Sequence, residues 1–360
     1  MTEEKFECDN CNAELRFEPG INALICPYCD TENKIDAGVP DEVKELDYLA
    51  HLKNAEASSE TTEVITVTCD ACKAELTFEP NITSDQCPFC ANDINAQQHS
   101  RHAIKPRSLL PFKVTVEESR AAFLKWVKSR WFAPGKLRRD AKMSKMAGVY
   151  MPFWTYDTNT TSDYSGSRGE YYYVSQTYTT TVNGKRVTRT RQVRRTRWYP
   201  ASGTVNNAFD DILVVASTAL PLKFAQKLDP WDLENLVPYT ADYLQGFRVQ
   251  SYSLGLEAGF AEAKEQITPV IRKDVYADIG GDTQRIHSIQ TRYNNVTFKH
   301  ILLPVWINAY RFKNRQYRIL VNARTGEVQG ERPWSWVKIA LFSLTILGII
   351  GAAAYFFSNS

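Results

Sequence analysis

Eight cysteines, arranged in four Cys-x-x-Cys pairs, are the residues of this sequence best suited to chemistry. Fourteen residues separate the first pair from the second, and the same spacing recurs in a second set 61 positions further on. Zinc favours four soft ligands in a tetrahedron, and two Cys-x-x-Cys turns joined by a hairpin can supply them. One ion would be bound by Cys8, Cys11, Cys26 and Cys29, and the other by Cys69, Cys72, Cys87 and Cys90.

These two zinc sites are expected to be structural. A catalytic zinc keeps one coordination position open, and four thiolates leave none. The metal would replace the core that a module of about thirty residues cannot build. The pattern Cys-Asp-x-Cys-x-Ala-Glu-Leu-x-Phe-Glu-Pro occurs at 8–19 and again at 69–80, which indicates an internal duplication of zinc ribbons.

Nothing else in the sequence predicts an enzyme. The chain contains no phosphate-binding glycine loop, no nucleophile elbow and no His-Glu-x-x-His zinc motif. His51, His99 and His102 lie near cysteine quartets that are already complete, and His287 and His300 stand alone in strand-like segments where packing is the expected role. We therefore name no catalytic residue and expect that the protein is not an enzyme.

The charge of the chain is divided between its two parts. Residues 1–99 contain 6 Lys and Arg against 21 Asp and Glu, whereas residues 100–360 contain 37 against 20. The first part therefore carries −15 and the second +17. No positively charged, apolar leader opens the sequence, so the cysteines are expected in a reducing cytosol, where thiolate sites are favoured over disulfides.

The end of the chain has the composition of a membrane span. Nineteen residues from Ile339 to Phe357 carry no charge, which as a helix covers about 28 Å. Trp334 and Trp336 lie at one end with basic residues, so the N-terminal bulk should remain cytoplasmic. A small-xxx-small pair, Gly348 and Ala352, is weak support for a homo-oligomer. The alternative is a buried core helix.

The remaining elements predict an α+β fold. We expect zinc ribbon 1 at 1–37, an acidic helical linker at 38–63, zinc ribbon 2 at 64–98, an α+β domain at 104–333 and a transmembrane helix at 336–357. Within the domain, strands are expected at 109–114, 149–154, 212–216, 285–293, 296–311 and 316–321, and helices at 115–133, after Asp229-Pro230 and at 256–279.

A basic hairpin at 170–198 is the other conspicuous feature of the domain. Asn183-Gly184 is a strong hairpin turn, and counting outward places Tyr178 opposite Arg189 and Tyr172 opposite Arg195. The cations of the second strand are Lys185, Arg186, Arg189, Arg191, Arg194, Arg195 and Arg197.

Four interpretations of this hairpin remain open. It could be an edge whose charges discourage aggregation, or it could bind anionic lipid headgroups beside the membrane. It could also bind the acidic zinc ribbons, of this chain or of another protein. Nucleic acid is the fourth interpretation, because seven cations could contact phosphates.

Several motifs resemble a family of bacterial zinc-ribbon membrane proteins. They are the paired cysteine turns, Leu-Leu-Pro-Phe at 109–112, Gly-Val-Tyr-Met-Pro-Phe-Trp at 148–154, Leu-Leu-Pro-Val-Trp at 302–306 and Asn-Ala-Arg-Thr-Gly-Glu-Val-Gln-Gly-Glu-Arg-Pro at 322–333. Members are often labelled as primosomal protein N′, a superfamily II helicase, or as transcription-factor-type zinc ribbons. The resemblance does not carry helicase activity, because the chain lacks a nucleotide-binding loop.

The resemblance implies a place in membrane-stress systems with phage-shock-protein-A-like and flotillin-like (SPFH) proteins. We therefore expect a membrane-anchored cytoplasmic adaptor whose zinc ribbons bind a protein partner. The alternative is a nucleic-acid-binding protein that uses the basic hairpin without helicase activity. The charge of the ribbons argues against DNA binding by the ribbons themselves, because thiolate-bound zinc adds further negative charge and phosphate is repelled.

Overall fold

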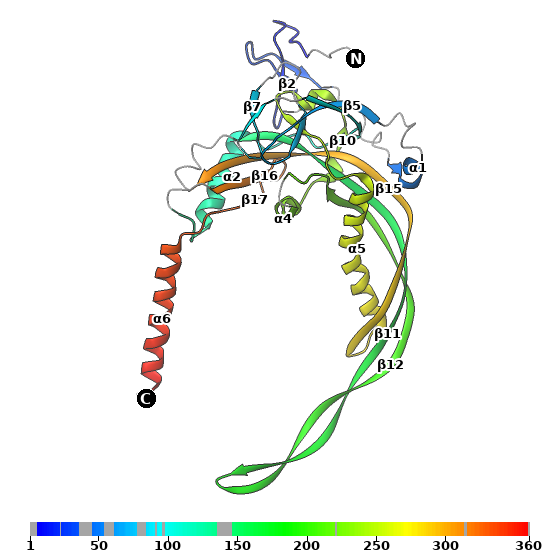
Figure 1. The fold of residues 1–360 in the computed structure, drawn as a ribbon, viewed down its shortest axis with the longest axis vertical. Coiled ribbons are helices and arrows are strands. Elements are labelled where there is room, and N and C mark those ends of the chain that lie inside the picture. Colours follow the sequence, from blue (N-terminus) through cyan, green and yellow to red (C-terminus); the bar gives the residue numbers. More distant parts are fainter. Residues whose placement is uncertain are drawn as a thin grey trace.

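The computed structural model describes residues 6–21, 23–35, 45–53, 61–77, 84–90, 92–95, 98–134, 146–219, 222–312 and 315–358. Over these residues the chain is an α+β protein with a large β-rich body. The two cysteine modules lie at one end of the body, and a long strand arm and the C-terminal helix project from it in the opposite direction (Figure 1).

Three long antiparallel strands form the centre of the body and the arm. β11 (Ala147–Val182) pairs along one edge with β12 (Lys185–Val215) and along the other with β15 (Thr283–Phe312). β15 continues the sheet to β16 (Arg315–Asn322) and β17 (Val328–Gly330). The short strand β10 (Ser108–Leu109) pairs with β15 on the same edge as β16, and β13 (Val237–Pro238) pairs with β10.

The expected division of these long strands into shorter ones is wrong. The segments expected as separate strands are parts of β11, β12 and β15, at 149–154, 212–216, 285–293 and 296–311. The linking segments are rich in Thr, Ser and Asn, but their hydroxyl groups bond across the sheet. Thr158 Oγ1 donates to the carbonyl oxygen of Asn294 at 3.1 Å, and Ser162 Oγ lies 2.8 Å from Thr291 Oγ1. Both side chains are buried, so a polar segment continues the strand without a break.

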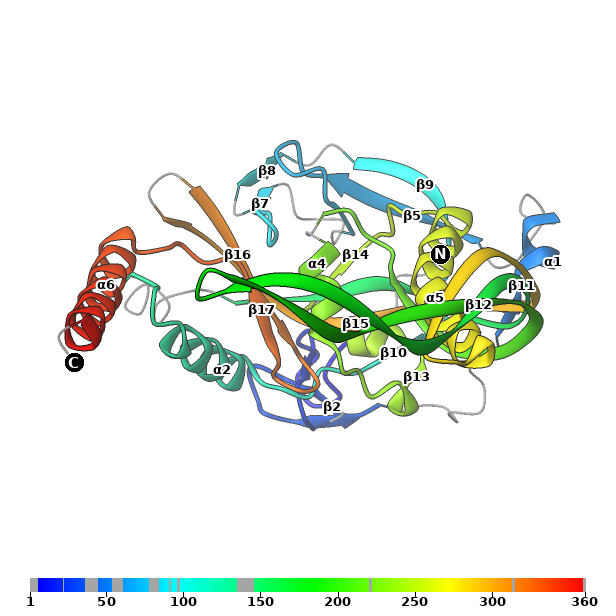
Figure 2. The same ribbon diagram turned by 90° about the horizontal axis from the view of Figure 1, so that it is seen from below.

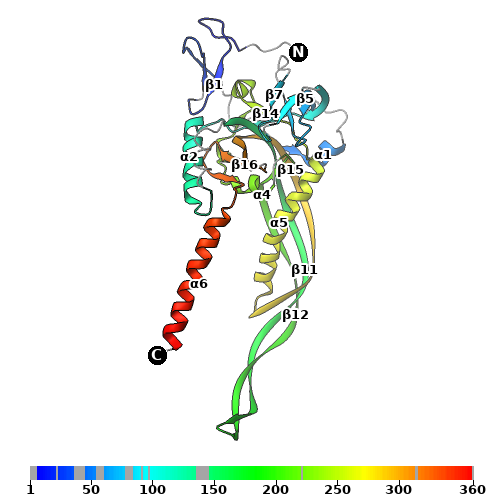
Figure 3. The ribbon, with the colours of Figure 1, turned by 60° about the vertical axis from the view of Figure 1, so that its left-hand side comes forward.

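One helix covers the upper part of the arm. α5 runs over Leu256–Ile279 as expected, and Gly280 and Gly281, with φ of +64° and +78°, end it. Its apolar side, including Ile267, Ile271 and Val275, packs against Tyr164. Beyond this helix and the start of β15, only β11 and β12 continue, as a two-stranded ribbon (Figure 3).

The two cysteine modules cover opposite faces of the body sheet (Figure 2). The first contains β1 (Arg16–Glu18), β2 (Ala23–Ile25) and β3 (Glu32–Lys34), and its Phe17 packs 5.3 Å from the ring of Tyr243. Phe17 belongs to the same core as Tyr150 and Leu302. The second contains β5 (Thr61–Thr68), β6 (Glu75–Thr77), β7 (Ser84–Gln86), β8 (Asp93–Asn95) and β9 (Gln98–Ile104).

The second module is joined to the body by backbone hydrogen bonds. β6 pairs with β14 (Arg248–Gln250), which in turn pairs with β11. Leu76 and Phe89 pack with Met151 and Phe153, on the face of the sheet opposite to Tyr150. The acidic ribbons therefore dock on the body, and they lie at the end farthest from the tip of the basic hairpin (Figure 1).

The linker between the modules is only partly the expected helix. Leu46–Asp47 form β4, which pairs with β15, and helix α1 covers Tyr48–Lys53. Residues 38–44 and 54–60 of the predicted linker lie outside the described residues. Tyr48 packs 4.9 Å from the ring of Phe260, so the linker is held against the body.

The other helices of the body are α2 (Val116–Ser129), α4 (Leu222–Ala225) and three short 3₁₀ turns, η3 (Gln226–Leu228), η4 (Leu233–Asn235) and η5 (Ala241–Leu244). α2 begins with a capping box, in which Thr115 and Glu118 bond reciprocally. The helix expected to open at Asp229-Pro230 is wrong, since both residues lie in a loop between η3 and η4. The strand expected at 109–114 keeps only Leu109 in a ladder.

The C-terminal helix α6 (Trp336–Ser358) projects on the same side of the body as the arm (Figures 1 and 3). Its first turns contact the end of α2. Lys338 Nζ donates to the carbonyl oxygens of Trp131 at 3.0 Å and Ala133 at 2.8 Å, and the ring of Phe342 lies 5.5 Å from that of Phe132. Trp131 follows α2 and is 69% exposed.

Candidate functional sites

The structure brings each predicted cysteine quartet together. Within each quartet all sulfur atoms lie within 4.8 Å of one another. The closest Sγ pairs, such as Cys8 with Cys29 and Cys72 with Cys87, are 3.5 and 3.6 Å apart. A tetrahedron with zinc–sulfur bonds of about 2.3 Å has edges of roughly 3.8 Å. Both quartets are therefore compatible with one zinc ion each, and none of the eight cysteines forms a disulfide.

The backbone of each Cys-x-x-Cys turn is bent to direct two thiols to one point. The residue after the second cysteine has a left-handed φ in three of the turns, at Asn12 (56°), Asp30 (56°) and Lys73 (59°). In each case its N–H donates to the carbonyl oxygen of the first cysteine, at 2.7 to 3.0 Å. Asn and Asp tolerate this conformation, so the sequence suits the turn.

Hydrogen bonds favour the thiolate form at Cys8, Cys29 and Cys72, whereas the pKa values of their partners Cys11, Cys87 and Cys90 are raised. The Thr31 hydroxyl, 3.1 Å from Cys29 Sγ, lowers the pKa of that thiol to about 6. The neighbouring thiol of Cys87 lowers the pKa of Cys72 to about 5. Metals bind the thiolate, so these groups suit the soft donor set that zinc requires.

The duplicated modules differ at one equivalent position. Tyr28 and Phe89 both stand between the cysteines of the turns Cys26–Cys29 and Cys87–Cys90. Phe89 is fully buried in the core of the body, whereas Tyr28 is 81% exposed. Exposed acidic side chains of the same module include Asp9, Glu14, Glu18, Asp30 and Glu32. The first ribbon thus presents an aromatic ring within an acidic surface.

The basic hairpin has the predicted register. Tyr178 lies opposite Arg189, Gln176 opposite Arg191 and Tyr172 opposite Arg195. Since directly opposed side chains share a face of an antiparallel pair, five of the seven cations lie on one face, here called the cationic face. These are Lys185, Arg189, Arg191, Arg195 and Arg197.

Aromatic rings and arginines alternate along this ribbon. The guanidinium of Arg197 lies 5.2 Å from the ring of Tyr172, and that of Arg191 5.4 Å from Tyr178. Arg186 and Arg194 lie on the other face, where Arg194 stacks 4.2 Å from Tyr171. All seven cations are exposed, and residues 171–198 contain no acidic residue. The ribbon is therefore a surface for an anionic ligand or an edge protected by charge.

The C-terminal helix is long and apolar enough to cross a membrane. Trp336–Phe357 has a mean hydropathy of 2.1 and none of its apolar window is buried in the protein. Its 23 residues extend about 34 Å. The alternative of a core helix would require a covering layer, and the described residues provide none beyond the contacts of its first turns.

Comparisons with known proteins give one distant relative. The chain is 26% identical over 345 residues to the uncharacterized protein YdjG of Bacillus subtilis (strain 168), and the match covers 95% of this chain and 94% of YdjG. YdjG has no assigned activity in that description. No family model matches the chain, and no solved structure matches it.

The motifs that carry the family resemblance meet in the core of the body. Leu110 N–H donates to Leu302 O at 3.1 Å, and Lys113 N–H to Ala323 O at 3.0 Å. Arg324 forms a bidentate ion pair with Asp232, and its Nη1 donates to Pro111 O at 3.1 Å. These motifs therefore hold the fold together.

Sequence reasoning missed a buried lysine and its carboxylates. Lys299 is 7% exposed, and its Nζ lies 2.9 Å from Asp211 Oδ1 and 3.2 Å from Glu45 Oε1. Burial, together with Glu45, raises the pKa of Asp157 to about 7. Oxygens of Glu45, Asp157 and Asp210 lie within 4.8 Å of one another, and the Lys299 ammonium forms ion pairs with Glu45 and Asp211. The residues of this charged cluster are up to 254 positions apart in the sequence, so no local pattern reveals the cluster.

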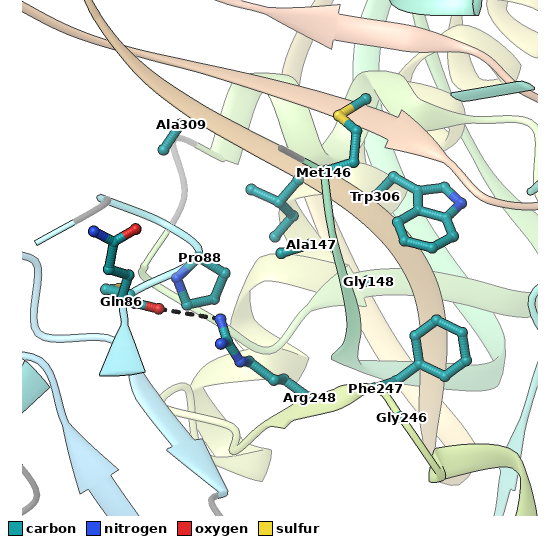
Figure 4. A pocket seen from close by; sticks show the side chains of 12 residues that line it. Gln86, Pro88, Met146, Ala147, Gly148, Gly246, Phe247, Arg248, Trp306 and Ala309 are labelled. Carbon is teal, nitrogen blue, oxygen red and sulfur yellow. Dashed lines mark hydrogen bonds between the residues drawn. The ribbon is translucent and has the colours of Figure 1, made fainter. Parts of the chain in front are cut away.

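A groove lies between the second ribbon and the body, with a volume of about 480 Å³ (Figure 4). It is lined by Phe247, Trp306 and Met146, and Arg248 Nη1 donates to Gln86 O at 3.1 Å across it. Among the described residues, its lining contains no carboxylate and no histidine. The groove therefore offers an apolar wall beside one guanidinium.

The histidines have differing surroundings. His300 is buried, with Nδ1 2.8 Å from Ile104 O and its ring 4.8 Å from Trp154, as expected for a packing residue. His287 is instead exposed, 2.9 Å from Ser167 Oγ, so the expectation of packing is wrong there. His51 packs on Phe298 at 5.2 Å. The side chains of His99 and His102 lie outside the described residues.

Proposed function

We propose that this chain is a single-pass membrane protein whose cytoplasmic body uses two structural zinc ribbons and serves as an adaptor. The exposed apolar surface of α6 supports the anchor. The basic residues Arg332 and Lys338 before the span favour a cytoplasmic body. The geometry of the two cysteine quartets supports the proposal that each binds one zinc ion.

The exposed Tyr28 is the observation that carries the adaptor role. The second ribbon packs on the body through Phe89, whereas the first ribbon packs on the body through Phe17. Tyr28 of the first ribbon is therefore exposed and not used for packing on the body. Tyrosines in a desolvated centre are frequent hot spots of protein interfaces. With acidic groups around it, Tyr28 fits a partner that offers an apolar pocket with a basic rim. By family resemblance, phage-shock-protein-A-like and SPFH proteins are the partner classes to test first.

The arm limits how the anchored protein can be oriented. α6 and the arm project on the same side, and the tip of the hairpin reaches beyond the C-terminal end of α6 (Figures 1 and 3). Hydrocarbon excludes open strand edges and guanidinium groups. The arm must therefore bend away from an inserted α6, with the cationic face of the ribbon at the headgroups.

A photo-crosslinking pull-down from membranes tests the adaptor role. The intact chain is compared with Tyr28→Ala and with Tyr173→Ala, a matched control because Tyr173 is 65% exposed on the hairpin. Tyr28→Ala should lose the crosslinked partner while its zinc content stays at that of the parent chain, and Tyr173→Ala should keep it. Equal capture by all three proteins would reject the first ribbon as the docking surface.

The second candidate function is nucleic-acid binding by the ribbon, favoured by its alternating arginines and tyrosines. Such binding would weaken steeply with salt, in proportion to the phosphates contacted. Salt titrations of the intact protein with single-stranded DNA and with anionic vesicles separate the alternatives. Tight DNA binding without vesicle binding would favour the second candidate.

A further inference from the structure

The end of α2, beside the first turn of α6, carries hydrogen-bond donors for which the described residues provide no acceptor. Arg130 ends α2, and its guanidinium stacks 5.0 Å from the ring of Trp126. The Nε of Arg130 and the indole Nε1 of Trp126 are both buried, yet neither has a hydrogen-bond partner. A buried donor without an acceptor costs about 1–3 kcal/mol, so this pair is poorly satisfied in the protein alone.

A second arginine lies at the same place. Arg332, between β17 and α6, stacks 4.4 Å from the ring of Trp334, which packs 6.4 Å from Phe132. Burial, together with the positive charge of Arg130, lowers the pKa of Arg332. Neither arginine forms an ion pair among the described residues. Two like charges are thus held together without an anion.

The position of this cluster indicates which anion it would meet. It lies where α2 ends beside the first turn of α6, the point at which the chain would enter a bilayer (Figure 3). Exposed rings lie near it in the chain, namely Trp131 (69%), Trp334 (53%) and Trp336 (79%). Tryptophans of this kind settle at the headgroup level of a membrane, where lipid phosphates are concentrated.

We propose that Arg130, Arg332 and the indole N–H of Trp126 form a binding site for the phosphate of an anionic phospholipid headgroup at the base of α6. The site rests on the proposed membrane anchorage. It adds a specific lipid contact that seats the body on the membrane, independent of the basic hairpin. A phosphate accepts from guanidinium groups at a geometry that matches their planar donors, and it removes the repulsion between the two arginines.

The test uses the full chain in a neutral detergent, titrated with short-chain phosphatidylglycerol, with phosphatidylcholine of the same chain length and with inorganic phosphate. Bound lipid is followed by native mass spectrometry and by the shift in Tm. The variant is Arg130→Gln/Arg332→Gln. The matched control is Lys125→Gln/Lys128→Gln, which removes the same charge from the exposed side of α2.

The parent chain and the control should bind phosphatidylglycerol at least about tenfold more tightly than phosphatidylcholine, and inorganic phosphate weakly. The double arginine variant should lose phosphatidylglycerol affinity by at least about tenfold, the effect of one or more charge-assisted hydrogen bonds. Its Tm without lipid should be unchanged or higher, because the repulsion is removed. A structural role for these arginines would instead lower that Tm.

Three outcomes would contradict the site. The double arginine variant could bind phosphatidylglycerol as tightly as the parent chain does. The lysine control could lose as much affinity as the arginine variant, which would indicate diffuse electrostatic attraction. Inorganic phosphate could bind as tightly as the lipid. Alkaline extraction of membranes from the same cells separates this failure from that of the anchor. A chain that stays in the membrane without preferring phosphatidylglycerol contradicts the lipid site alone.

Discussion

Leu76 of the second zinc ribbon is the strand partner of Gln250 in the body, and both side chains are buried. Gln250 in turn donates to Ser217 Oγ. The ribbon is thus an extension of the body sheet, and its metal site and the body should be thermodynamically coupled.

Replacing one ligand of the second site should therefore destabilise the body. Cys87→Ser should reduce zinc from two ions per chain to one and lower the free energy of unfolding by several kcal/mol, since structural zinc contributes about 10–16 kcal/mol of apparent binding energy. Metal analysis and calorimetry of the purified chain check both effects. Two retained zinc ions, or an unchanged Tm with one ion, would argue against the coupling.

A close approach between α5 and β11 gives a second prediction. A Cβ at Gly259 would overlap Tyr156 Oη and lie 2.8 Å from Trp154 Cδ1. Both rings are buried; Tyr156 Oη donates to Leu256 O at 2.7 Å at the start of α5, and Trp154 Nε1 donates to Leu254 O at 2.9 Å just before it. Gly259→Ala should cost about 1–3 kcal/mol, although Ala is otherwise the better helix former.

Gly255→Ala is the matched control, because nothing lies within 4 Å of a Cβ there. Because Gly255 is the N-cap of α5, where Ala is less favourable, the substitution should lower the free energy of unfolding by less than about 1 kcal/mol. Denaturant unfolding measures both variants. Equal stability of the two would show that the helix does not approach the sheet this closely.

The carboxylates near Lys299 predict a dependence on pH. Because the pKa of Asp157 is raised to about 7, the folded chain keeps a proton that the unfolded chain releases near its ordinary value of 3.8. The stability from this group is complete below that value and is lost as pH rises toward 7.

Asp157→Asn removes this pH-dependent loss of stability. Between pH 5 and pH 8 the free energy of unfolding of the variant should rise by about 1–2 kcal/mol relative to that of the parent chain, after allowance for solvent screening of a partly exposed group. Thermal unfolding at both pH values measures the difference. A gain that is the same at pH 5 and pH 8 would contradict the raised pKa.

The two faces of the hairpin should differ in their affinity for anionic membranes. The protein in neutral nanodiscs is mixed with vesicles that contain phosphatidylglycerol. Arg189→Gln/Arg191→Gln, on the cationic face, should weaken vesicle binding more than Arg186→Gln/Arg194→Gln on the other face. Each cation near such a surface contributes about 1 kcal/mol. Equal losses of vesicle binding would mean that the ribbon does not approach the membrane with its cationic face. The free energy of unfolding should be unaffected in both variants, because all four side chains are exposed.

Local patterns in the sequence predicted the elements that depend on neighbours in the chain. The register around Asn183-Gly184, the bounds of α5 and the capping box at Thr115 and Glu118 all follow from turn, cap and periodicity rules. The cysteine spacing predicted both quartets because four ligands within one short module must meet.

Features that depend on distant contacts could not be predicted in the same way. Nothing local distinguishes Tyr28 from Phe89, since only docking on the body decides which is buried. The Thr-rich segment around Thr160 resembles a loop until its partners in β12 and β15 are known. Arg130 and Arg332 are likewise brought together only by the fold, about two hundred positions apart.

Alkaline carbonate extraction of membranes from cells that make the intact chain tests the anchor directly. The parent chain should remain in the membrane pellet, whereas Leu344→Arg/Leu347→Arg, which places two charges in the middle of α6, should be released because each charge costs about 2.5–3.5 kcal/mol in the span. Release of the parent chain at the same step as the variant would contradict a membrane-spanning α6.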